Sequence, residues 1–147
     1  EHFISNLIKQ KILINLDACS ETTSKETDKI FILFLPENEI HDLGLMFLNY
    51  ELESRGYKCV YLGQNMHIEN LKYIVNTQHN PHFISYLTVN PCDTSVKQFA
   101  EDFNKTIEEE NIPLYLMGRI VQKVDQKELP ANVQILKTID ALTATLN

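Results

Sequence analysis

Residues 36–44 carry the side chains best suited to chemistry in this chain. His41 lies two positions after Glu39, so this carboxylate could accept the proton on Nδ1 of the imidazole and leave Nε2 free to bind a metal. Gly44 follows three positions later and would let a bulky group pass close to the backbone. The same residues also fit a solvated histidine beside a glutamate that only complements a helix dipole, because one histidine and one acid are a weak metal signal.

These residues follow the first of five apolar segments that alternate with helical patterns. The continuous apolar run 30–35, ended by Pro36, is typical of a strand buried on both faces, and 43–55 carries a helical apolar stripe that ends at Gly56. The same unit recurs, with strands predicted at 59–62, 83–87, 114–117 and 133–136, and helical stretches predicted around 71–75, at 94–111, just after Gly118 and at 139–146. This alternation predicts an α/β fold, a flavodoxin-like (Rossmann-like) doubly wound five-stranded parallel sheet.

The chain divides into three parts by composition. Residues 1–20 have apolar side chains at mostly helical spacing and are predicted to form one amphipathic helix. Residues 21–28 are polar, without apolar periodicity, and are predicted to be a linker. Residues 29–147 form the Rossmann-like domain. Since the sequence opens in helical sequence without a Met, we expect it to be part of a longer chain.

Ligands of such sheets bind at the carboxyl ends of the strands, which places four loops at the predicted site. The loops are 36–44, 63–67, 88–93 and 118–121. None contains the glycine-rich motifs that hold dinucleotides or nucleoside triphosphates, and the whole chain has only four glycines. These ligands are therefore poor candidates. Two further histidines, His79 and His82, flank Pro81 in a turn and are interpreted as surface residues.

Charge and cysteine usage exclude other classes. Thirteen Lys and Arg against twenty Asp and Glu give a net charge of −7, which argues against DNA or anionic-lipid binding by this part of the chain. Three cysteines without paired spacing indicate neither a disulfide framework nor a zinc site and favour a reducing cytoplasm. No apolar run approaches the ~20 residues that span a bilayer.

Three spaced elements resemble those of cobalamin-binding domains. Glu39-x-His41-x-x-Gly44 is similar to the signature Asp/Glu-x-His-x-x-Gly, in which the histidine replaces the cofactor's own dimethylbenzimidazole as the lower ligand of cobalt. Ser85-Tyr86-Leu87 resembles the Ser-x-Leu that ends the third strand in that family. Met117-Gly118 stands where the family has Gly-Gly, at the place where the displaced nucleotide tail lies.

The first helix adds a narrower resemblance. Glu1-His2-Phe3-x-Ser5-Asn6-x-Ile8 is similar to the start of the last bundle helix in MerR-type, light- and cobalamin-sensing transcriptional regulators. The resemblance implies that residues 1–20 are the last helix of an upstream helical bundle. In those proteins the Glu-His pair helps to cover the upper face of the corrin, around the adenosyl group. The resemblance thus implies that Glu1 and His2 belong to the upper-face shell, whereas without it they are simply the solvated start of a helix.

The resemblance implies a cofactor, most simply adenosylcobalamin, with His41 as the metal ligand and no catalytic residue. The implied cofactor-binding residues are Glu39, His41, Asp42, Leu43, Gly44, Ser85, Leu87, Val89, Met117, Gly118, Glu1 and His2. The expected function is that of a sensor rather than an enzyme: cofactor state, possibly set by light, would control homo-oligomerisation and DNA binding by an N-terminal domain outside this sequence. The alternatives are a corrinoid-carrying module of a methyltransferase or mutase, and a cofactor-free interaction domain.

Overall fold

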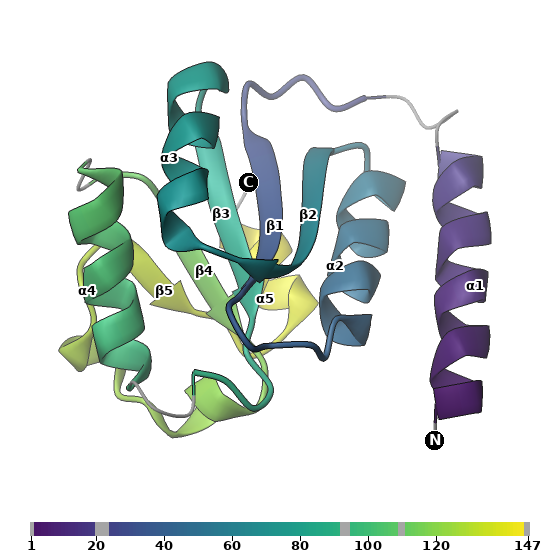
Figure 1. Cartoon of the computed structure of the whole chain (residues 1–147). Helices are drawn as coiled ribbons and strands as arrows, with labels where there is room; N and C mark the ends of the chain where they lie inside the picture. The colour runs from purple at the N-terminus through teal and green to yellow at the C-terminus, as the bar shows by residue number, and fades with distance from the viewer. Residues whose placement is uncertain (1, 20–23, 92–94, 109–110, 146–147) are drawn as a thin grey trace.

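The structure is a computed structural model that describes residues 2–19, 24–91, 95–108 and 111–145 (Figure 1). Its strands are β1 (Ile30–Pro36), β2 (Lys58–Met66), β3 (Pro81–Tyr86), β4 (Leu114–Met117) and β5 (Val133–Ile135). Its α-helices are α1 (His2–Cys19), α2 (Leu43–Ser54), α3 (Ile68–Thr77), α4 (Val96–Ile107) and α5 (Ile139–Thr145). Two short 3₁₀ helices, η1 (Ile120–Lys123) and η2 (Gln126–Glu128), follow β4.

The five strands form one parallel sheet in the order β2-β1-β3-β4-β5, which confirms the predicted flavodoxin-like topology. Helices α3 and α4 cover one face of the sheet, and α2 and α5 cover the other (Figure 1). The predicted two-sided burial of β1 is also confirmed. Phe31, Leu33 and Leu35 pack under α2, whereas Ile32 and Phe34 pack on the opposite side, and all five are fully buried.

Strand β2 and helix α4 differ most in length from the prediction. Strand β2 continues to Met66, through what was predicted as a loop from Gly63, because Gly63 takes a positive φ of 80° and the pairing with β1 resumes after an irregularity. Helix α4 is shorter than predicted. Its first N–H groups are capped by Ser95, and it ends at Ile107 because Glu108 adopts the left-handed conformation.

Helix α1 packs against α2 rather than against the sheet (Figure 1). Ile12 is its buried contact, and Lys9 forms a 2.6 Å ion pair with Asp42, just before α2. Phe3, Ile4 and Ile14 stay largely exposed. The helix therefore leaves apolar side chains uncovered, and its assignment to a helical bundle stays a prediction. None of the helices in the described ranges is long and apolar enough to cross a membrane.

The interpretation of His82 as a surface residue is wrong, while His79 is exposed as predicted. His82 belongs to β3 and is only 7% exposed, because strand β3 already begins at Pro81. Its ring stacks on Tyr115 at 6.0 Å, and its Nδ1 lies 3.3 Å from the Tyr115 hydroxyl. Burial, with the nearby charge of Lys29, lowers the pKa of His82 to about 4 against the opposing effect of Asp28.

Candidate functional site

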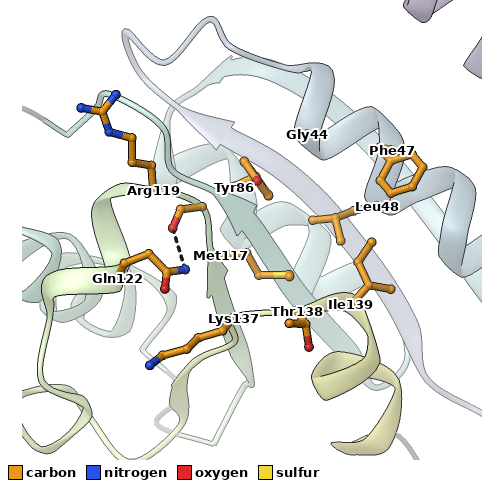
Figure 2. Close-up of a pocket in the computed structure, with 11 residues that line it drawn as sticks. Gly44, Phe47, Leu48, Tyr86, Met117, Arg119, Gln122, Lys137, Thr138 and Ile139 are labelled. Atoms are coloured by element: carbon orange, nitrogen blue, oxygen red, sulfur yellow. Dashed lines mark hydrogen bonds between the residues drawn. The ribbon is translucent and has the colours of Figure 1, made fainter.

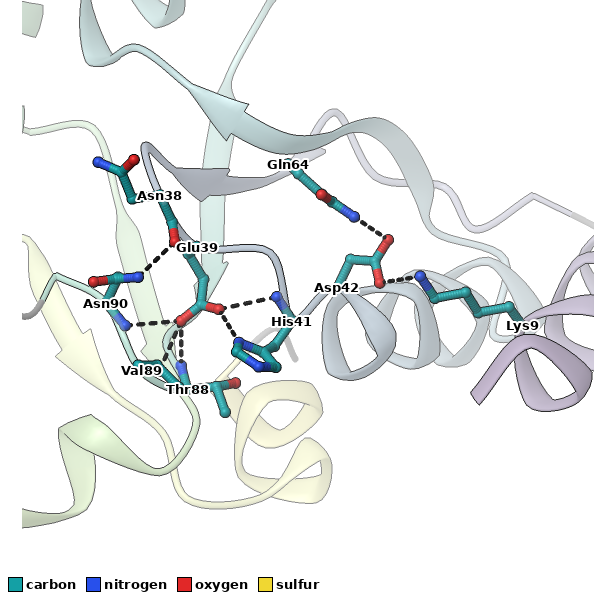
Figure 3. Close-up of polar contacts among 9 residues, drawn as sticks. All are labelled: Lys9, Asn38, Glu39, His41, Asp42, Gln64, Thr88, Val89 and Asn90. Carbon is teal, nitrogen blue, oxygen red and sulfur yellow. Dashed lines mark hydrogen bonds and ion pairs between the residues drawn. The ribbon is translucent and has the colours of Figure 1, made fainter. Parts of the chain in front are cut away.

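Glu39 joins the loop after β1 to the loop after β3. Its side chain is fully buried, and Oε2 accepts hydrogen bonds from the backbone N–H groups of Thr88 (3.1 Å), Val89 (2.7 Å) and Asn90 (2.9 Å) (Figure 3). β1 and β3 are neighbours from which the chain winds in opposite directions, and ligands of open α/β sheets bind at this switch point. One carboxylate therefore fixes both loops at the place where a ligand is expected.

The other oxygen of Glu39 holds His41. Oε1 lies 2.7 Å from Nδ1 of the imidazole and accepts the backbone N–H of His41 at 2.9 Å (Figure 3). The predicted contact between these two side chains is therefore present. With Nδ1 carrying the proton toward the carboxylate, Nε2 keeps its lone pair, and the half-exposed ring can present it to a ligand.

Glu39 is ionised in the folded protein. Burial alone would raise its pKa, but the N–H groups of Val89, Asn90 and His41, together with the His41 ring, outweigh burial and lower the pKa to about 2. A carboxylate that accepts five hydrogen bonds cannot rotate without breaking several of them. It therefore orients the imidazole as well as selecting the protonated nitrogen.

The residue after His41 is tied to other elements. Asp42 pairs with Lys9 of α1 at 2.6 Å and accepts a hydrogen bond from the Gln64 amide of β2 at 2.7 Å (Figure 3). Burial raises the pKa of Asp42, but these two partners more than offset the effect, so the pKa lies below its ordinary value. His41 is thus flanked by two anchored carboxylates, one held by the β3 loop and one by α1 and β2.

An open cavity of about 410 Å³ lies beside the His41 ring. Its walls come from α1, from α2 and from the ends of the loops: Ile8, Ile12, His41, Leu43, Gly44, Phe47, Tyr86 and Thr88. Leu43 and Gly44, both predicted site residues, are among them. Because Ile8 and Ile12 belong to α1, a ligand bound at His41 would contact that helix directly.

A second, larger cavity of about 550 Å³ lies between α2, β4 and α5 (Figure 2). It is lined by Gly44, Phe47, Leu48, Tyr86, Met117, Gly118, Arg119, Gln122, Lys137, Thr138 and Ile139. Three of these residues, Gly44, Phe47 and Tyr86, also line the cavity beside His41. The two cavities therefore share a wall.

Tyr86 fills the space that Gly44 leaves. A Cβ placed on Gly44 would meet ring atoms of Tyr86 at 2.6–2.9 Å, so the bulky group that approaches the α2 backbone here is the chain's own tyrosine. The ring belongs to the wall between the two cavities (Figure 2). A ligand that reached from His41 into the second cavity would have to pack against this ring or displace it.

Met117 and Gly118 line the second cavity, but the backbone requires a particular residue type only at Gly118. Met117 ends β4, is 3% exposed and packs in the core under α2 and α5. Gly118 has a φ of 104°, and a Cβ there would overlap the carbonyl of Leu87, so this position requires glycine. The retained glycine is therefore needed for the backbone, whereas the methionine occupies volume beside the cavity.

The structure does not bring every predicted residue to the cavities. Ser85 and Leu87 are fully buried on the α3 and α4 face, since they alternate along the chain with Tyr86, which faces the other side. The Ser85 hydroxyl has no hydrogen-bond partner among the described residues. Val89 takes part through its peptide N–H, which donates a hydrogen bond to the Glu39 carboxylate. Glu1 lies outside the described residues, as does the side chain of His2, so their predicted roles stay predictions.

Sequence reasoning missed several residues of this site. Lys9, Gln64 and Tyr86 take part through side chains, and Thr88 and Asn90 through backbone N–H groups. Tyr86 stands inside the Ser-x-Leu element and was the easiest to find. Thr88 and Asn90 lie in the predicted site loop 88–93, but they were not singled out, because backbone N–H groups give no signal in side-chain type.

The donor set suits a metal that arrives inside a larger group. In the described part of the chain, no three His, Cys, Asp or Glu side chains gather to hold an ion by themselves. His41 is a single oriented imidazole beside two cavities, so it can supply one ligand to a metal whose other ligands come from a bound group.

The fold and the site together define an α/β domain of flavodoxin-like topology with a carboxylate-backed histidine at its switch point. Known protein families give no match to the sequence, and curated proteins give none. Solved structures do match. The monomethylamine corrinoid protein of Methanosarcina barkeri is 17% identical, with a TM-score of 0.68 over 92% of this chain and 64% of that one.

Two further structures are similar. The methanol:cobalamin methyltransferase complex MtaBC of Methanosarcina barkeri is 18% identical, with a TM-score of 0.61 over 86% of this chain and 48% of that one. A cobalamin-binding protein of Desulfitobacterium hafniense DCB-2 is 12% identical, with a TM-score of 0.55 over 96% and 69%. The chain thus spans less than two thirds of the first two, and at these identities the likeness establishes a shared fold.

Proposed function

We propose that this chain binds a cobalamin, with His41 as the lower ligand of cobalt. The observation that carries the proposal is the imidazole whose Nδ1 is held 2.7 Å from buried Glu39 at the switch point of the sheet, with Nε2 directed away from that carboxylate. The similar structures support it, because they are a corrinoid protein, a cobalamin methyltransferase complex and a cobalamin-binding protein.

The bound cofactor would supply its cobalt–carbon bond, and the chain's own residues would set how the cofactor is held. Glu39 keeps the His41 proton on Nδ1, so Nε2 stays a ligand. Ile8 and Ile12 line the cavity beside His41, and their apolar side chains would exclude water from the His41 imidazole. The cofactor would therefore contact both the Rossmann-like domain and α1.

At finer detail, we propose a sensor in which the adenosyl form of the cofactor controls oligomerisation and, through a further domain, DNA binding. The support is the position of α1, which lines the His41 cavity and is tied to Asp42 through Lys9. A ligand that contacts both parts stabilises only the arrangement in which they are together. Loss of the upper group, for example by light, would weaken that arrangement without any catalytic residue.

The second candidate is a corrinoid carrier for methyl transfer. It is favoured by the monomethylamine corrinoid protein and the methanol:cobalamin methyltransferase complex among the similar structures. Both candidates use the same lower ligand, so binding alone does not separate them. Methyl transfer from the loaded chain to an acceptor would support the carrier. A change of oligomeric state between the dark and illuminated adenosyl forms would support the sensor.

The binding test is reconstitution in the dark, followed by visible absorption and by electron paramagnetic resonance of the cobalt(II) form. One axial nitrogen splits that resonance, and growth on ¹⁵N-histidine changes the splitting from a triplet to a doublet only when a histidine is the ligand. We expect the doublet for the wild type and its loss in His41→Ala. His67→Ala is the matched control, because His67 is similarly exposed on a neighbouring loop and pairs with Glu37. A triplet in ¹⁵N-histidine protein would exclude His41 as the ligand.

A further inference from the structure

Helix α1 stands at the edge of the molecule, with α2 on one side of it, and carries a second apolar stripe beside the side chains that contact α2 (Figure 1). The stripe consists of Ile4, Leu7, Lys11, Ile14 and Ala18, and all five are exposed. Ile12, by contrast, is buried. Side chains spaced alternately by three and four residues lie on one face of a helix and form the seam through which helices pack on one another. This seam is uncovered in the described part of the chain.

The uncovered apolar surface is large for a single chain. Large apolar residues of α1 and α2 that are between 42% and 73% exposed contribute to it: Phe3, Ile4, Leu7, Ile8, Ile14 and Phe47. At ~180 Å² for a fully exposed residue of this size, they present on the order of 600 Å². A single chain rarely exposes more than a few hundred Å² of contiguous apolar surface, and one side of a standard protein interface buries about 800 Å². With Lys11 and Ala18, which lie between these residues, the surface reaches the size of such an interface.

A groove beside the stripe adds a second wall to this surface. Its volume is about 410 Å³, and it lies between α1 and α2, lined by Ile4, Leu7, Ile8, Lys11, Ile12, Asn15, Phe47 and Tyr50. Phe47 and Tyr50 form the wall on α2, with their ring centroids 6.4 Å apart. A helix that packed on the stripe would therefore contact both α1 and α2, as the helices of a four-helix bundle do.

We propose that this face is the interface between two copies of the chain, with their α1 helices packed antiparallel. The stripe is complementary to itself: about a two-fold axis at the level of residue 9, Ile4 faces Ile14 of the second copy, and Leu7 faces Lys11 of the second copy. The aliphatic stem of Lys11 covers the leucine, while its ammonium group reaches water. Parallel pairing in register would instead place the two lysines against each other, and like charges oppose association. The contact does not depend on a bound cofactor.

The test is sedimentation equilibrium of the chain without cofactor. We expect a dimer for the wild type, and we expect Leu7→Asp and Ile14→Asp to weaken it by about tenfold or more, because each places a carboxylate in the seam. Leu13→Asp is the matched control, since Leu13 is 55% exposed on the same helix but lies off the stripe, and it should leave the dimer unchanged. All three side chains are exposed, so the variants should fold, and circular dichroism at low concentration verifies this.

Two further measurements test the arrangement of the helices. Lys11→Leu should tighten the dimer by about tenfold, because a charged residue in a seam weakens it, and unchanged association would refute the placement of Lys11 there. Spin labels on Ala18→Cys, in a chain with its other cysteines replaced by serine, report the orientation. Antiparallel helices separate the two labelled positions by ~27 Å along the helix axis, whereas parallel helices bring them to about the 10 Å distance between packed helices. The short distance would refute the antiparallel interface.

The outcomes separate this interface from the proposed function. Leu7 and Ile14 do not line the His41 cavity, so cobalamin binding by the same proteins is an independent result. A monomeric wild type that binds cobalamin through His41 would refute the interface and leave the proposed function standing. A dimer that the stripe variants weaken, in a chain that binds no corrinoid, would do the reverse. A dimer that Leu7→Asp and Ile14→Asp leave intact is held by another surface and refutes the proposal. A longer form of the polypeptide that stays monomeric covers the stripe with its own additional segment, which also refutes the proposal.

Discussion

Substitution of Glu39 by glutamine tests the site most directly, because the change removes a charge but keeps the shape. Three backbone N–H groups point at Oε2, so the glutamine carbonyl oxygen must take that place. The amide NH₂ then faces the His41 ring, where Oε1 had been. An NH₂ group can only donate, so Nδ1 becomes the acceptor and the proton moves to Nε2. In this tautomer Nε2 of His41 carries the proton and has no lone pair with which to bind a metal, while the lone pair of Nδ1 is taken by the amide.

The magnitude follows from the pKa of Glu39. A carboxyl whose pKa falls from its ordinary 4.5 to about 2 on folding contributes about 3 kcal/mol at neutral pH. We therefore expect Glu39→Gln to lower the free energy of unfolding by about 3 kcal/mol and the melting temperature by on the order of 10 °C. Because the folded pKa is lowered, this contribution is present above pH 4.5 and is lost as the pH falls toward 2. The difference between wild type and variant should shrink over the same interval.

Cofactor affinity gives the second readout. Removal of the group that orients a metal-binding histidine typically weakens affinity about 10–100-fold, and we expect a loss of that size together with loss of the histidine signature in the cobalt(II) resonance. Glu37→Gln is the control, since Glu37 lies in the same loop, is half-exposed and pairs only with His67 among the described residues. Wild-type stability and affinity in Glu39→Gln would refute the argument that this carboxylate sets the tautomer.

Three further predictions concern other parts of the chain. Burial lowers the pKa of His82 to about 4, so on acidification the unfolded chain takes up this proton before the folded chain does. The free energy of unfolding of the wild type should therefore fall by about 3 kcal/mol between pH 6.5 and pH 4. Denaturant titrations should show that His82→Phe removes this fall. Lys9→Gln should lower the free energy of unfolding by at most about 1 kcal/mol, because the ion pair with Asp42 is partly exposed. The variant should nevertheless show faster amide hydrogen exchange in α1 than the wild type, with no change elsewhere. Unchanged exchange in α1 would mean that the ion pair does not hold the helix. Met117→Gly should lower the free energy of unfolding by about 3–5 kcal/mol, since the side chain is buried. The same change enlarges the second cavity and should tighten cobalamin binding. Unchanged or weaker affinity would show that the methionine does not obstruct the cofactor.

The sequence predicted the sheet well because its pattern is controlled by burial. A strand such as β1, with a helix layer on each side, needs apolar residues at every position, and this run is visible without a structure. Strand β2 was predicted too short, because its exposed edge position permits the polar residues Gln64 and Asn65 that are typical of loops. His82 was placed at the surface because residue type alone does not show that Tyr115 of the next strand stacks on it.

The predicted contact between Glu39 and His41 depends on two residues that are close in the chain, and it was accessible for that reason. The rest of the site depends on contacts of long sequence separation. The N–H groups that stabilise the Glu39 carboxylate come from about fifty residues later, and they are backbone groups that nearly every residue type carries. The placement of Ser85 was not predicted either, since strand alternation places it on one face and Tyr86 on the other.

Two anchored carboxylates make His41 a junction between the loop after β3 and helix α1. Glu39 connects the ring to the loop after β3, and Asp42, the next residue after His41, connects the same backbone to α1 through Lys9. Movement of α1 would thus reach the backbone beside the imidazole through one ion pair, while the five hydrogen bonds of Glu39 oppose any change in the ring. The contact between α1 and the backbone beside His41 can therefore be weakened at Lys9 without loss of the tautomer, whereas a change at Glu39 alters the tautomer and leaves the ion pair in place. If the sensor proposal holds, Lys9→Gln should bind cobalamin normally but change its oligomeric state less when the cofactor is lost. Glu39→Gln should bind cobalamin more weakly than the wild type.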